Sequence, residues 1–479
     1  MKREGIPLVL SLILLPPLFA QEPDRGTPPP SGPLPMMKLP PIQRGRLSNG
    51  LPFLLMEKHD VPLVEIRMII EAGTAAEEVG MFGVASLTAA LLTEGAGKHD
   101  AQGLADALDF LGVRLSVSAG LHTTAVSLST PLSKLDDALA LFTDVIRRPL
   151  FDEKELERIR KDRLTALRQW HDEPRVIATI LFNRLLYGET HPYGRIPTGM
   201  EKDLRSLTVP TIRSFYEEHY HAGTATLVVV GDVNPMEFLA KCESAFGDWE
   251  ARPAQRVETA VRKTQQPTRI TIVHKPTAVQ SEIRIGYIGA ERTSPDYAAL
   301  LVLNTILGGS FASRLNQNLR EKHGYTYGAR SSFSFRRAAG PFLAATAVQT
   351  DVTDKAVREC INELESIRLP VSREELERAK RYIACTYIQN FETAGHTADE
   401  LGELVEFLLP DDTFTSFIDR ILAVTIEDVR QAAEKYFDTD HLEIVVVGDR
   451  NEIEPGLRSL RLGKIRILDS EDVLGKRPG

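Results

Sequence analysis

The sequence predicts an α+β protein made of two homologous tandem domains, each an α/β sandwich. Three pairs of segments repeat at one spacing of 217 residues. They are the strand motifs TLVVVGDVN and EIVVVGDRN, the segments TVPTIRSFYEEHYH and TIEDVRQAAEKYFD, and the tripeptide Glu-Ile-Arg that begins at Glu65 and at Glu282. Three matches at one spacing indicate an internal duplication. A chain of 479 residues also exceeds what one hydrophobic core usually holds, so two domains are expected.

The first 41 residues are expected to precede both domains. Residues 1–20 start with Lys2 and Arg3, continue with an apolar run and end at the small residue Ala20, which is typical of a cleavable secretory signal. The run is too short and too proline-rich to span a membrane as a helix. The prolines of residues 21–41 predict an extended linker. We therefore expect an exported protein, periplasmic or secreted; the alternative is a cytosolic protein with an uncleaved amphipathic start.

In the first domain, residues 42–250, turn residues and apolar periodicity set the order of elements. Asn49-Gly50 is a turn signal that joins two strands of a hairpin, and an apolar strand follows in VPLVEIRMIIEA. The alternating runs VRLSVSAG and HTTAVSLST predict a second hairpin. TLVVVG is expected as a final buried strand. Helices are predicted over residues 82–94, 101–111, 131–147, 152–187 and 208–220.

The second domain, residues 266–450, is expected to repeat this order after a polar linker at residues 251–265. Residues 451–479 are assigned to a C-terminal tail. The charged segment DEKELERIRKDR, which opens the helix predicted from residue 152, is interpreted as a solvated helix face.

Charge and cysteine content exclude several functions. A net charge of −9 does not favour nucleic-acid binding, which needs a basic face. Cys242, Cys360 and Cys385 form no C-x-x-C pair and cannot all be disulfide-bonded, so buried thiols are expected, with a single bridge as the alternative. His219 and His221 could chelate a metal ion, but they stand where a helix runs into a loop.

Four stretches of this duplicated chain match motifs of a known protein family: LSNGLPFLL, EAGT, HPYGR and LGGSFASRLNQNLREKHGYTYG. Together with the repeated VVVGD motif they resemble the pitrilysin/insulinase (inverzincin) family of zinc peptidases, over roughly residues 45–450. The resemblance implies a duplicated metallopeptidase-like fold with two LuxS/metallopeptidase-like halves.

The zinc motif of that family is missing from this chain. Active members carry H-x-x-E-H on a helix, in which the two histidines bind zinc and the glutamate activates water, and a later glutamate completes the site. The resemblance places Ser86 and Ala90 at the histidine positions, Ala89 at the base position and Ala166 near the later glutamate. Alanine has no donor atom and serine is a poor zinc ligand. The chain is therefore expected to bind no metal and no cofactor of its own.

The second domain keeps a pair of residues that the family uses at its active site. The resemblance assigns Arg320 and Tyr327, seven residues apart in LREKHGYTYG, to binding the peptide carbonyl and the developing oxyanion. Tyr325 is the alternative to Tyr327. The alternative is a purely structural role, in which Arg320 belongs to the charged last turn of a helix and Gly324 ends that helix.

Some bacterial members of the family divide the active site between two chains, and this sequence resembles the zinc-less Arg/Tyr type. The resemblance implies a subunit that is inactive alone and completes the site of a homologous H-x-x-E-H partner in a heterodimeric metallopeptidase. The partner then supplies the zinc ion, and peptides bind by adding a strand to a sheet edge, near Thr74 and Ala75. The alternatives are a homodimer and a catalytically inactive scaffold or peptide-binding protein. An independent hydrolase is disfavoured because the sequence contains no G-x-S-x-G.

Overall fold

The computed structural model describes most of the chain, and residues 35–479 form one compact unit. The residues it describes are 32, 34, 38–253, 259–261 and 266–478. The predicted signal (residues 1–20) and most of the proline-rich linker (residues 21–41) lie outside the described residues, as do parts of the linker at 251–265.

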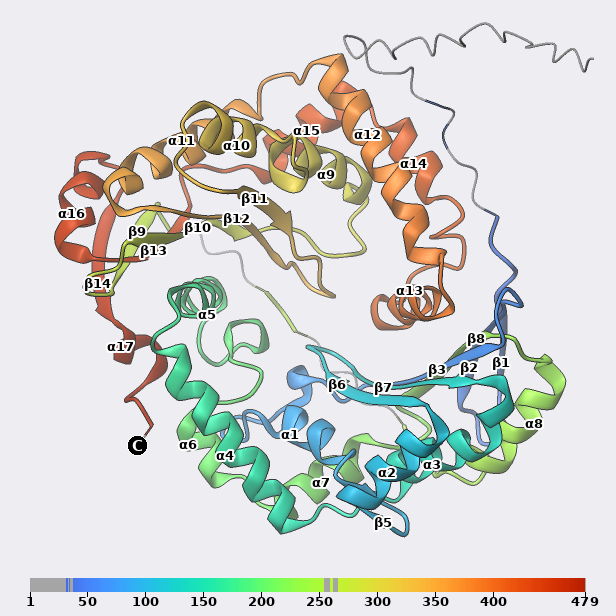
Figure 1. The fold of residues 1–479 in the computed structure, drawn as a ribbon. Coiled ribbons are helices and arrows are strands. Elements are labelled where there is room, and N and C mark those ends of the chain that lie inside the picture. The colour runs from blue at the N-terminus through green and yellow to red at the C-terminus, as the bar shows by residue number, and fades with distance from the viewer. Residues whose placement is uncertain (1–31, 33, 35–37, 254–258, 262–265, 479) are drawn as a thin grey trace, which may run out of the picture. The chain divides into compact units, whose positions relative to one another are not determined.

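Each repeat forms one mixed six-stranded sheet, and the α+β class and the duplication are confirmed (Figure 1). The strands of the first sheet are, in spatial order, β1 (Gln43–Arg46), β2 (Pro52–Glu57), β8 (Ala225–Gly231), β3 (Leu63–Ile70), β7 (Thr124–Pro131) and β6 (Arg114–Ala119). Those of the second sheet are β11 (Ala329–Phe333), β12 (Pro341–Gln349), β10 (Gln280–Ile288), β13 (Glu443–Gly448), β9 (Arg269–His274) and β14 (Lys464–Asp469). A small hairpin joins β4 (Gly95–Ala96) to β5 (His99–Asp100).

The two sheets share one topology over five strands. In the first, β3 pairs antiparallel with β7 and β8, and β8 pairs parallel with β2. In the second, β10 pairs antiparallel with β12 and β13, and β13 pairs parallel with β9. The sheets differ at one edge, where β1 is antiparallel to β2 but β14 is parallel to β9. The repeated Glu-Ile-Arg and VVVGD motifs are therefore equivalent central strands.

The predicted helices occur in the expected order with one clear exception, and two further helices of the first half, Glu201–Ser206 and Pro235–Phe246, were not predicted. The helices of the first half are α1 (Val84–Leu91), α2 (Ala101–Leu111), α3 (Leu135–Arg147), α4 (Glu153–Trp170), α5 (Pro174–Tyr187), α6 (Glu201–Ser206), α7 (Val209–His219) and α8 (Pro235–Phe246). Those of the second half are α9 (Tyr297–Asn304), α10 (Arg314–Asn316), α11 (Thr353–Ser366), α12 (Arg373–Tyr387), α13 (Ala394–Phe407), α14 (Phe417–Ala423), α15 (Ile426–Tyr436), α16 (Arg450–Ser459) and α17 (Ser470–Leu474).

The single helix predicted over residues 152–187 is wrong, because the chain breaks there into α4 and α5. Pro174 is the first residue of α5. Proline has no N–H to donate, and its ring collides with the carbonyl group four residues earlier, so it begins a helix but interrupts a continuing one. The break lets α5 leave the direction of α4.

The segment expected as a C-terminal tail, residues 451–479, is structured up to Leu474. It holds most of α16, then β14 and α17, and β14 pairs in register with β9 at the edge of the second sheet. The second sheet therefore extends beyond residue 450, where the sequence placed the end of the domain.

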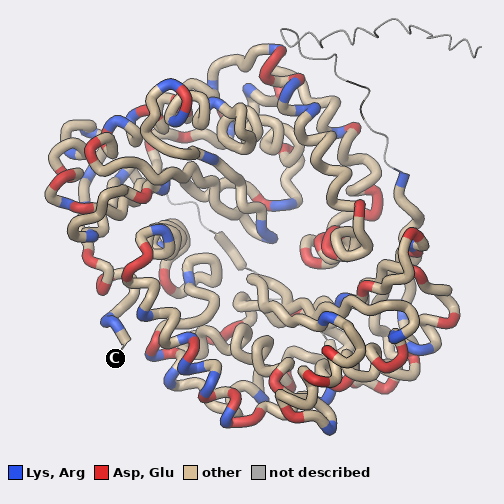
Figure 2. The backbone as a smooth tube through the Cα atoms, viewed as in Figure 1, with Lys and Arg blue, Asp and Glu red and all other residues tan. Residues whose placement is uncertain are grey.

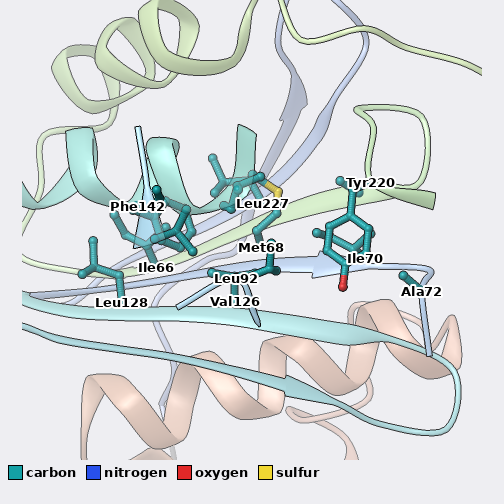
Figure 3. Close-up of a cluster of buried hydrophobic side chains, with 14 of the residues drawn as sticks. Ile66, Met68, Ile70, Ala72, Leu92, Val126, Leu128, Phe142, Tyr220 and Leu227 are labelled. Atoms are coloured by element: carbon teal, nitrogen blue, oxygen red, sulfur yellow. The ribbon is translucent and has the colours of Figure 1, made fainter. Parts of the chain in front are cut away.

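The core of the first half lies between the sheet and the helices on its outer face (Figure 3). Ile66, Met68 and Ile70 alternate along β3, as the period of two in a strand requires, and all three are fully buried. Phe142 of α3 packs against the same cluster. A corresponding cluster fills the second half and includes buried residues of the stretch from Tyr297 to Lys322. That stretch is long and apolar enough to cross a membrane by length and composition alone, and half of its most apolar window is buried inside the fold.

Each half covers the other half's sheet with one helix (Figure 1). Helix α5, from the first half, packs on β10 and β13 of the second sheet, and its Ile177 and Leu181 join a buried cluster with Val445 and Val447. Helix α13, from the second half, packs on β3 and β8 of the first sheet through Ala398, Leu401 and their neighbours. This exchange buries the central part of the second face of each sheet and ties the halves together.

An ion pair adds to this connection. Arg337 donates to both carboxylate oxygens of Glu71, at 2.6 and 2.8 Å, and to the carbonyl oxygen of Glu406 on α13. A bidentate guanidinium–carboxylate contact fixes geometry as well as charge. Its two ends belong to different halves, so it joins the inner end of the first sheet to α13.

Candidate functional site

Helix α1 carries three of the four positions to which the resemblance assigns the zinc-site residues of the family, namely Ser86, Ala89 and Ala90. It begins after Gly83, whose φ of 89° lies in the left-handed region and where a Cβ atom would meet the carbonyl oxygen of Thr198 at 2.5 Å. Ala89 is 2% exposed, whereas Ser86 and Ala90 are half-buried. The fourth position, Ala166, lies on α4, which packs against α1. The structure thus brings together the helices that carry the four positions.

The guanidinium group of Arg163 lies against one of these positions. Arg163, one turn before Ala166 on α4, donates to the hydroxyl oxygen of Ser86 at 2.8 Å and to the Ser86 carbonyl oxygen at 2.8 Å. Burial lowers the pKa of Arg163 to about 10, so the group stays charged at neutral pH. A cation therefore bonds the residue at the first histidine position. Sequence reasoning missed it because Arg163 ends the charged run that was interpreted as a solvated face.

A buried carboxylate fixes the start of α1 next to this arginine. One oxygen of Glu77 accepts hydrogen bonds from the amides of Gly83 (3.0 Å) and Ala85 (3.1 Å), and the other lies 3.8 Å from Arg195. The Glu77 side chain is 1% exposed. Burial raises its pKa to about 8, against the effect of those amide bonds and of Arg195. Arg195 belongs to the HPYGR motif, but only the fold shows that it faces Glu77.

Replacing Glu77 with Gln is expected to flatten the pH dependence of stability. The folded chain binds this proton more tightly than an unfolded chain with the ordinary pKa of 4.5. The resulting stabilisation is complete below pH 4.5 and is lost as the pH rises through about 8. One proton contributes a slope of at most ~1.4 kcal/mol per pH unit. Urea unfolding at several pH values should show a smaller decline between pH 5 and 8 in Glu77→Gln than in the parent, since glutamine retains the accepting oxygen.

The matched control is the exposed neighbour, Glu78→Gln, which should leave the slope unchanged. Equal slopes in the parent and in Glu77→Gln would show that Glu77 titrates normally in the folded chain.

The residues at the three zinc-ligand positions do not fit a zinc ion, because Ala90 and Ala166 have no donor atom and Ser86 bonds an arginine. In the described part of the chain, no group of three or more His, Cys, Asp or Glu side chains is arranged to hold a metal ion. His219 and His221 are engaged elsewhere. The His219 ring packs on Phe215 with centroids 4.4 Å apart, and Nδ1 of His221 accepts the amide of Gly223 at 3.2 Å.

The second candidate feature is the Arg320 and Tyr327 pair. Arg320 lies on the π-helix Gln317–Lys322, with its guanidinium 4.6 Å above the ring of Phe311 and 3.6 Å from a carboxylate oxygen of Glu321. Tyr327 is 93% exposed. Tyr325, the alternative, stacks on a histidine ring and packs against the second core. Of the two tyrosines, only Tyr327 presents its whole side chain to solvent.

The loop that carries Tyr327 is held in place by hydroxyl groups on either side. Thr326 accepts the amide of Gly328 at 3.0 Å and receives a hydrogen bond from Thr346 of β12, also at 3.0 Å. The turn before it uses Gly324, with φ of 66°, just after the helical segment ends. Among the described residues, no hydrogen bond or ion pair links Arg320 or Tyr327 to α1 or α4.

The three cysteines are free thiols, so no bridge forms among them. Cys242 and Cys360 are buried, which raises the pKa of each thiol to about 12, and Cys385 is exposed on α12. Neither buried thiol is a nucleophile at neutral pH.

The edge suggested for peptide pairing, near Thr74 and Ala75, is already used within the chain. The amides of these residues donate to the carbonyl oxygens of Gly120 and Leu121 at 3.0 and 2.7 Å. The first sheet instead ends at β6, whose outer side has no neighbouring strand in the sheet. The free edge of β6 is therefore a place where an extended peptide can pair as an additional strand.

Two family models match the chain. "Insulinase (Peptidase family M16)" matches residues 53–189, and "Peptidase M16 inactive domain" matches residues 206–383, which together make more than half of the chain.

Relatives and solved structures agree with these matches. The chain is 20% identical to the "non-peptidase homolog YmxG" of Helicobacter pylori, over 84% of this chain and 93% of the relative. It is 23% identical to the "zinc protease PqqE" of the same bacterium, over 83% and 91%. A crystal structure described as a peptidase M16 inactive domain, from Pseudomonas fluorescens, superposes with a TM-score of 0.80 at 26% identity, covering 85% of this chain and 98% of that one.

Proposed function

The chain belongs to the insulinase family of peptidases, family M16, and from this premise we propose that it is the zinc-less subunit of an exported heterodimeric peptidase. A homologous partner with the H-x-x-E-H motif supplies the zinc ion and the general base. This chain supplies Arg320 and Tyr327 and part of the peptide-binding surface. The exported location rests on the signal-like residues 1–20.

The observation that carries the proposal is the state of the former zinc site. Ser86 is hydrogen-bonded to Arg163, and α1 is held by Glu77, so the helices of the motif are kept while their ligand positions are filled by a cation and by methyl groups. Chemistry that the family performs at this place has to come from another chain. The Arg163 guanidinium, hydrogen-bonded to Ser86, would repel a zinc ion bound between these two helices, because like charges repel strongly in a partly buried site.

The placement of Arg320 and Tyr327 supports a role in the partner's site. Tyr327 is exposed, Arg320 is half-buried against Phe311 and Glu321, and neither residue belongs to the second core. A guanidinium donates in a fixed fork to a carbonyl oxygen, and a phenol donates to an oxyanion. An exposed tyrosine at the end of a hydrogen-bonded loop is suited to act on a group from outside its own chain.

The names of the two Helicobacter relatives support a pair of chains. One bacterium has both a "zinc protease" and a "non-peptidase homolog" that resemble this chain over most of their lengths. Two homologous chains with complementary sites are what a divided peptidase requires. The alternative, an inactive scaffold or peptide-binding protein of the same fold, keeps the fold without needing a zinc-bearing partner.

The test is to isolate the tagged chain under mild conditions from the envelope of its own cells and to identify its companion by mass spectrometry. We expect a stoichiometric companion of similar size with H-x-x-E-H, and zinc-dependent peptide cleavage by the pair but not by either chain alone. Recovery of the chain alone, or with unrelated envelope proteins, would reject the divided peptidase in favour of the scaffold.

A further inference from the structure

A hollow of about 420 Å³ lies where α5 leaves part of the second sheet uncovered. Three arginines from three elements line it: Arg175 in the first turn of α5, Arg284 on β10 and Arg330 on β11. Figure 2 shows basic positions both on α5 and on β11. Tyr327 lines the same hollow. Since α5 comes from the first half of the chain, both halves build this site.

The register of the sheet explains how two of the arginines meet. Arg284 and Arg330 are both paired with Ala345 of β12, one from each side, so the three residues form a row across the sheet. Neighbouring strands lie ~4.8 Å apart, which puts the two arginine backbones ~10 Å from each other. Only the methyl group of Ala345 stands between them. The hollow is the space that this small residue leaves between two long side chains.

As far as the structure describes the chain, only one of the three arginines, Arg284, has a carboxylate partner. Arg284 donates to a carboxylate oxygen of Glu282 at 2.8 Å and to the carbonyl oxygen of Ile283 at 2.9 Å, and it is buried. Burial is the main reason that its pKa is lowered, and the nearby charges of Arg175 and Arg330 act in the same direction.

Arg175 and Arg330 are both exposed, and within the described residues neither guanidinium has an ion pair or a hydrogen bond. The wall of the hollow therefore holds three guanidinium groups against the single carboxylate of Glu282. This excess of positive charge stands in a chain whose net charge is −9.

We propose that this hollow is a subsite for a carboxylate group of a bound peptide, either an acidic side chain or the C-terminal carboxylate. Guanidinium groups bind carboxylates through two parallel hydrogen bonds, and Arg175 and Arg330 each have all their donors available. Arg284 is buried at the bottom of the hollow, where its hydrogen bond to Glu282 fixes its position. Because Tyr327 borders the hollow, the carboxylate lies close to the peptide group on which Tyr327 acts. That last statement rests on the proposed function, whereas the carboxylate site itself does not.

The test measures peptide binding to this chain alone, by fluorescence polarisation. Three labelled probes share one sequence: a peptide with acidic side chains and a free C-terminus, its C-terminal amide, and a form in which Asp and Glu are replaced by Asn and Gln. The double variant Arg175→Gln/Arg330→Gln should bind the first probe roughly tenfold more weakly than the parent, a loss that two charge-assisted contacts can account for. The difference should shrink as salt is raised from 0.05 to 0.5 M.

The matched control is Arg466→Gln, which removes an exposed arginine from the opposite edge strand of the same sheet, β14, and should bind like the parent. Thermal unfolding of each variant checks that it is folded. If the parent protein binds the C-terminal amide more weakly than the first probe, the site binds the C-terminal carboxylate. If it binds the Asn/Gln peptide more weakly than the first probe, the site binds acidic side chains.

The inference is overturned if the parent binds all three probes equally, if it binds none, or if the double variant binds like the parent. These outcomes are separate from the proposed function, whose test is the companion chain. A divided peptidase without carboxylate preference, and a carboxylate-dependent peptide binder without a partner, are distinguishable results.

Discussion

Replacing Arg320 with Ala should lower kcat for peptide cleavage by the reconstituted pair by about two to three orders of magnitude, the usual cost of losing one oxyanion donor. Tyr327→Phe should have an effect of the same order, because it removes only the phenolic donor. The measurement is steady-state cleavage of a labelled peptide by the purified complex, with kcat and KM determined separately. An interaction formed only in the transition state lowers kcat and kcat/KM together and leaves KM nearly unchanged.

The control for this prediction is Lys322→Ala, which removes an exposed charge from the same helical turn and should leave kcat within about twofold. Tyr325→Phe is a second control, because Tyr325 packs against the core. Arg320 and Tyr327 contribute little to the core, so their variants should unfold like the parent. A complex in which Arg320→Ala and Tyr327→Phe retain full kcat would make the pair a remnant of the family sequence and would favour the scaffold.

Restoring the four zinc-site residues should fail to restore zinc binding as long as Arg163 remains. The variant Ser86→His/Ala89→Glu/Ala90→His/Ala166→Glu recreates the family motif at the positions implied by the sequence. Arg163, however, donates at 2.8 Å to the side chain of Ser86, so its guanidinium group overlaps the space of the first imidazole. Two unit charges 4 Å apart repel by about 4 kcal/mol at an effective dielectric constant of 20, and a divalent ion doubles this energy.

Adding Arg163→Ala to the four substitutions should therefore raise the zinc affinity at least about a hundredfold, measured by competition with a chromophoric chelator at pH 7.5. The control is Lys161→Ala on the same four-fold background, since Lys161 is an exposed residue of the same helix. Equal zinc affinity with and without Arg163 would contradict the view that this arginine takes the place of the metal ion.

Local pattern was sufficient for the strands of the first sheet and for the duplication. The alternation in VRLSVSAG and HTTAVSLST predicted β6 and β7, the Asn49-Gly50 signal predicted the turn between β1 and β2, and the offset of 217 residues placed β3 on β10 and β8 on β13. These features depend on neighbours a few residues away or on a repeat that the chain carries in itself. The loss of zinc ligands was also visible, because the identity of Ser86, Ala89, Ala90 and Ala166 needs no structure.

The ends of helices and domains, and the burial of charged side chains, were harder to predict because they depend on residues far away in the sequence. The run from residue 152 has a charged, helical pattern, which predicts a solvated helix, yet Arg163 turns inward because α1 presents Ser86 to it. The continuous helix to residue 187 was wrong because apolar periodicity continues across Pro174 although the backbone does not. The tail after residue 450 was missed because the short β14 is recognisable only beside β9.

The sequence by itself determined that this protein is a duplicated α+β chain of the insulinase type without its zinc ligands, since repeats, turn residues and missing side chains are properties of the chain alone. Only the tertiary structure decided that α5 and α13 exchange sheets, that Arg163 fills the vacated site and that Arg175, Arg284 and Arg330 meet in one hollow. The physical reason is that periodicity reports which side chains are buried, but not which surface buries them. Pairing and packing select that surface from segments up to several hundred residues apart.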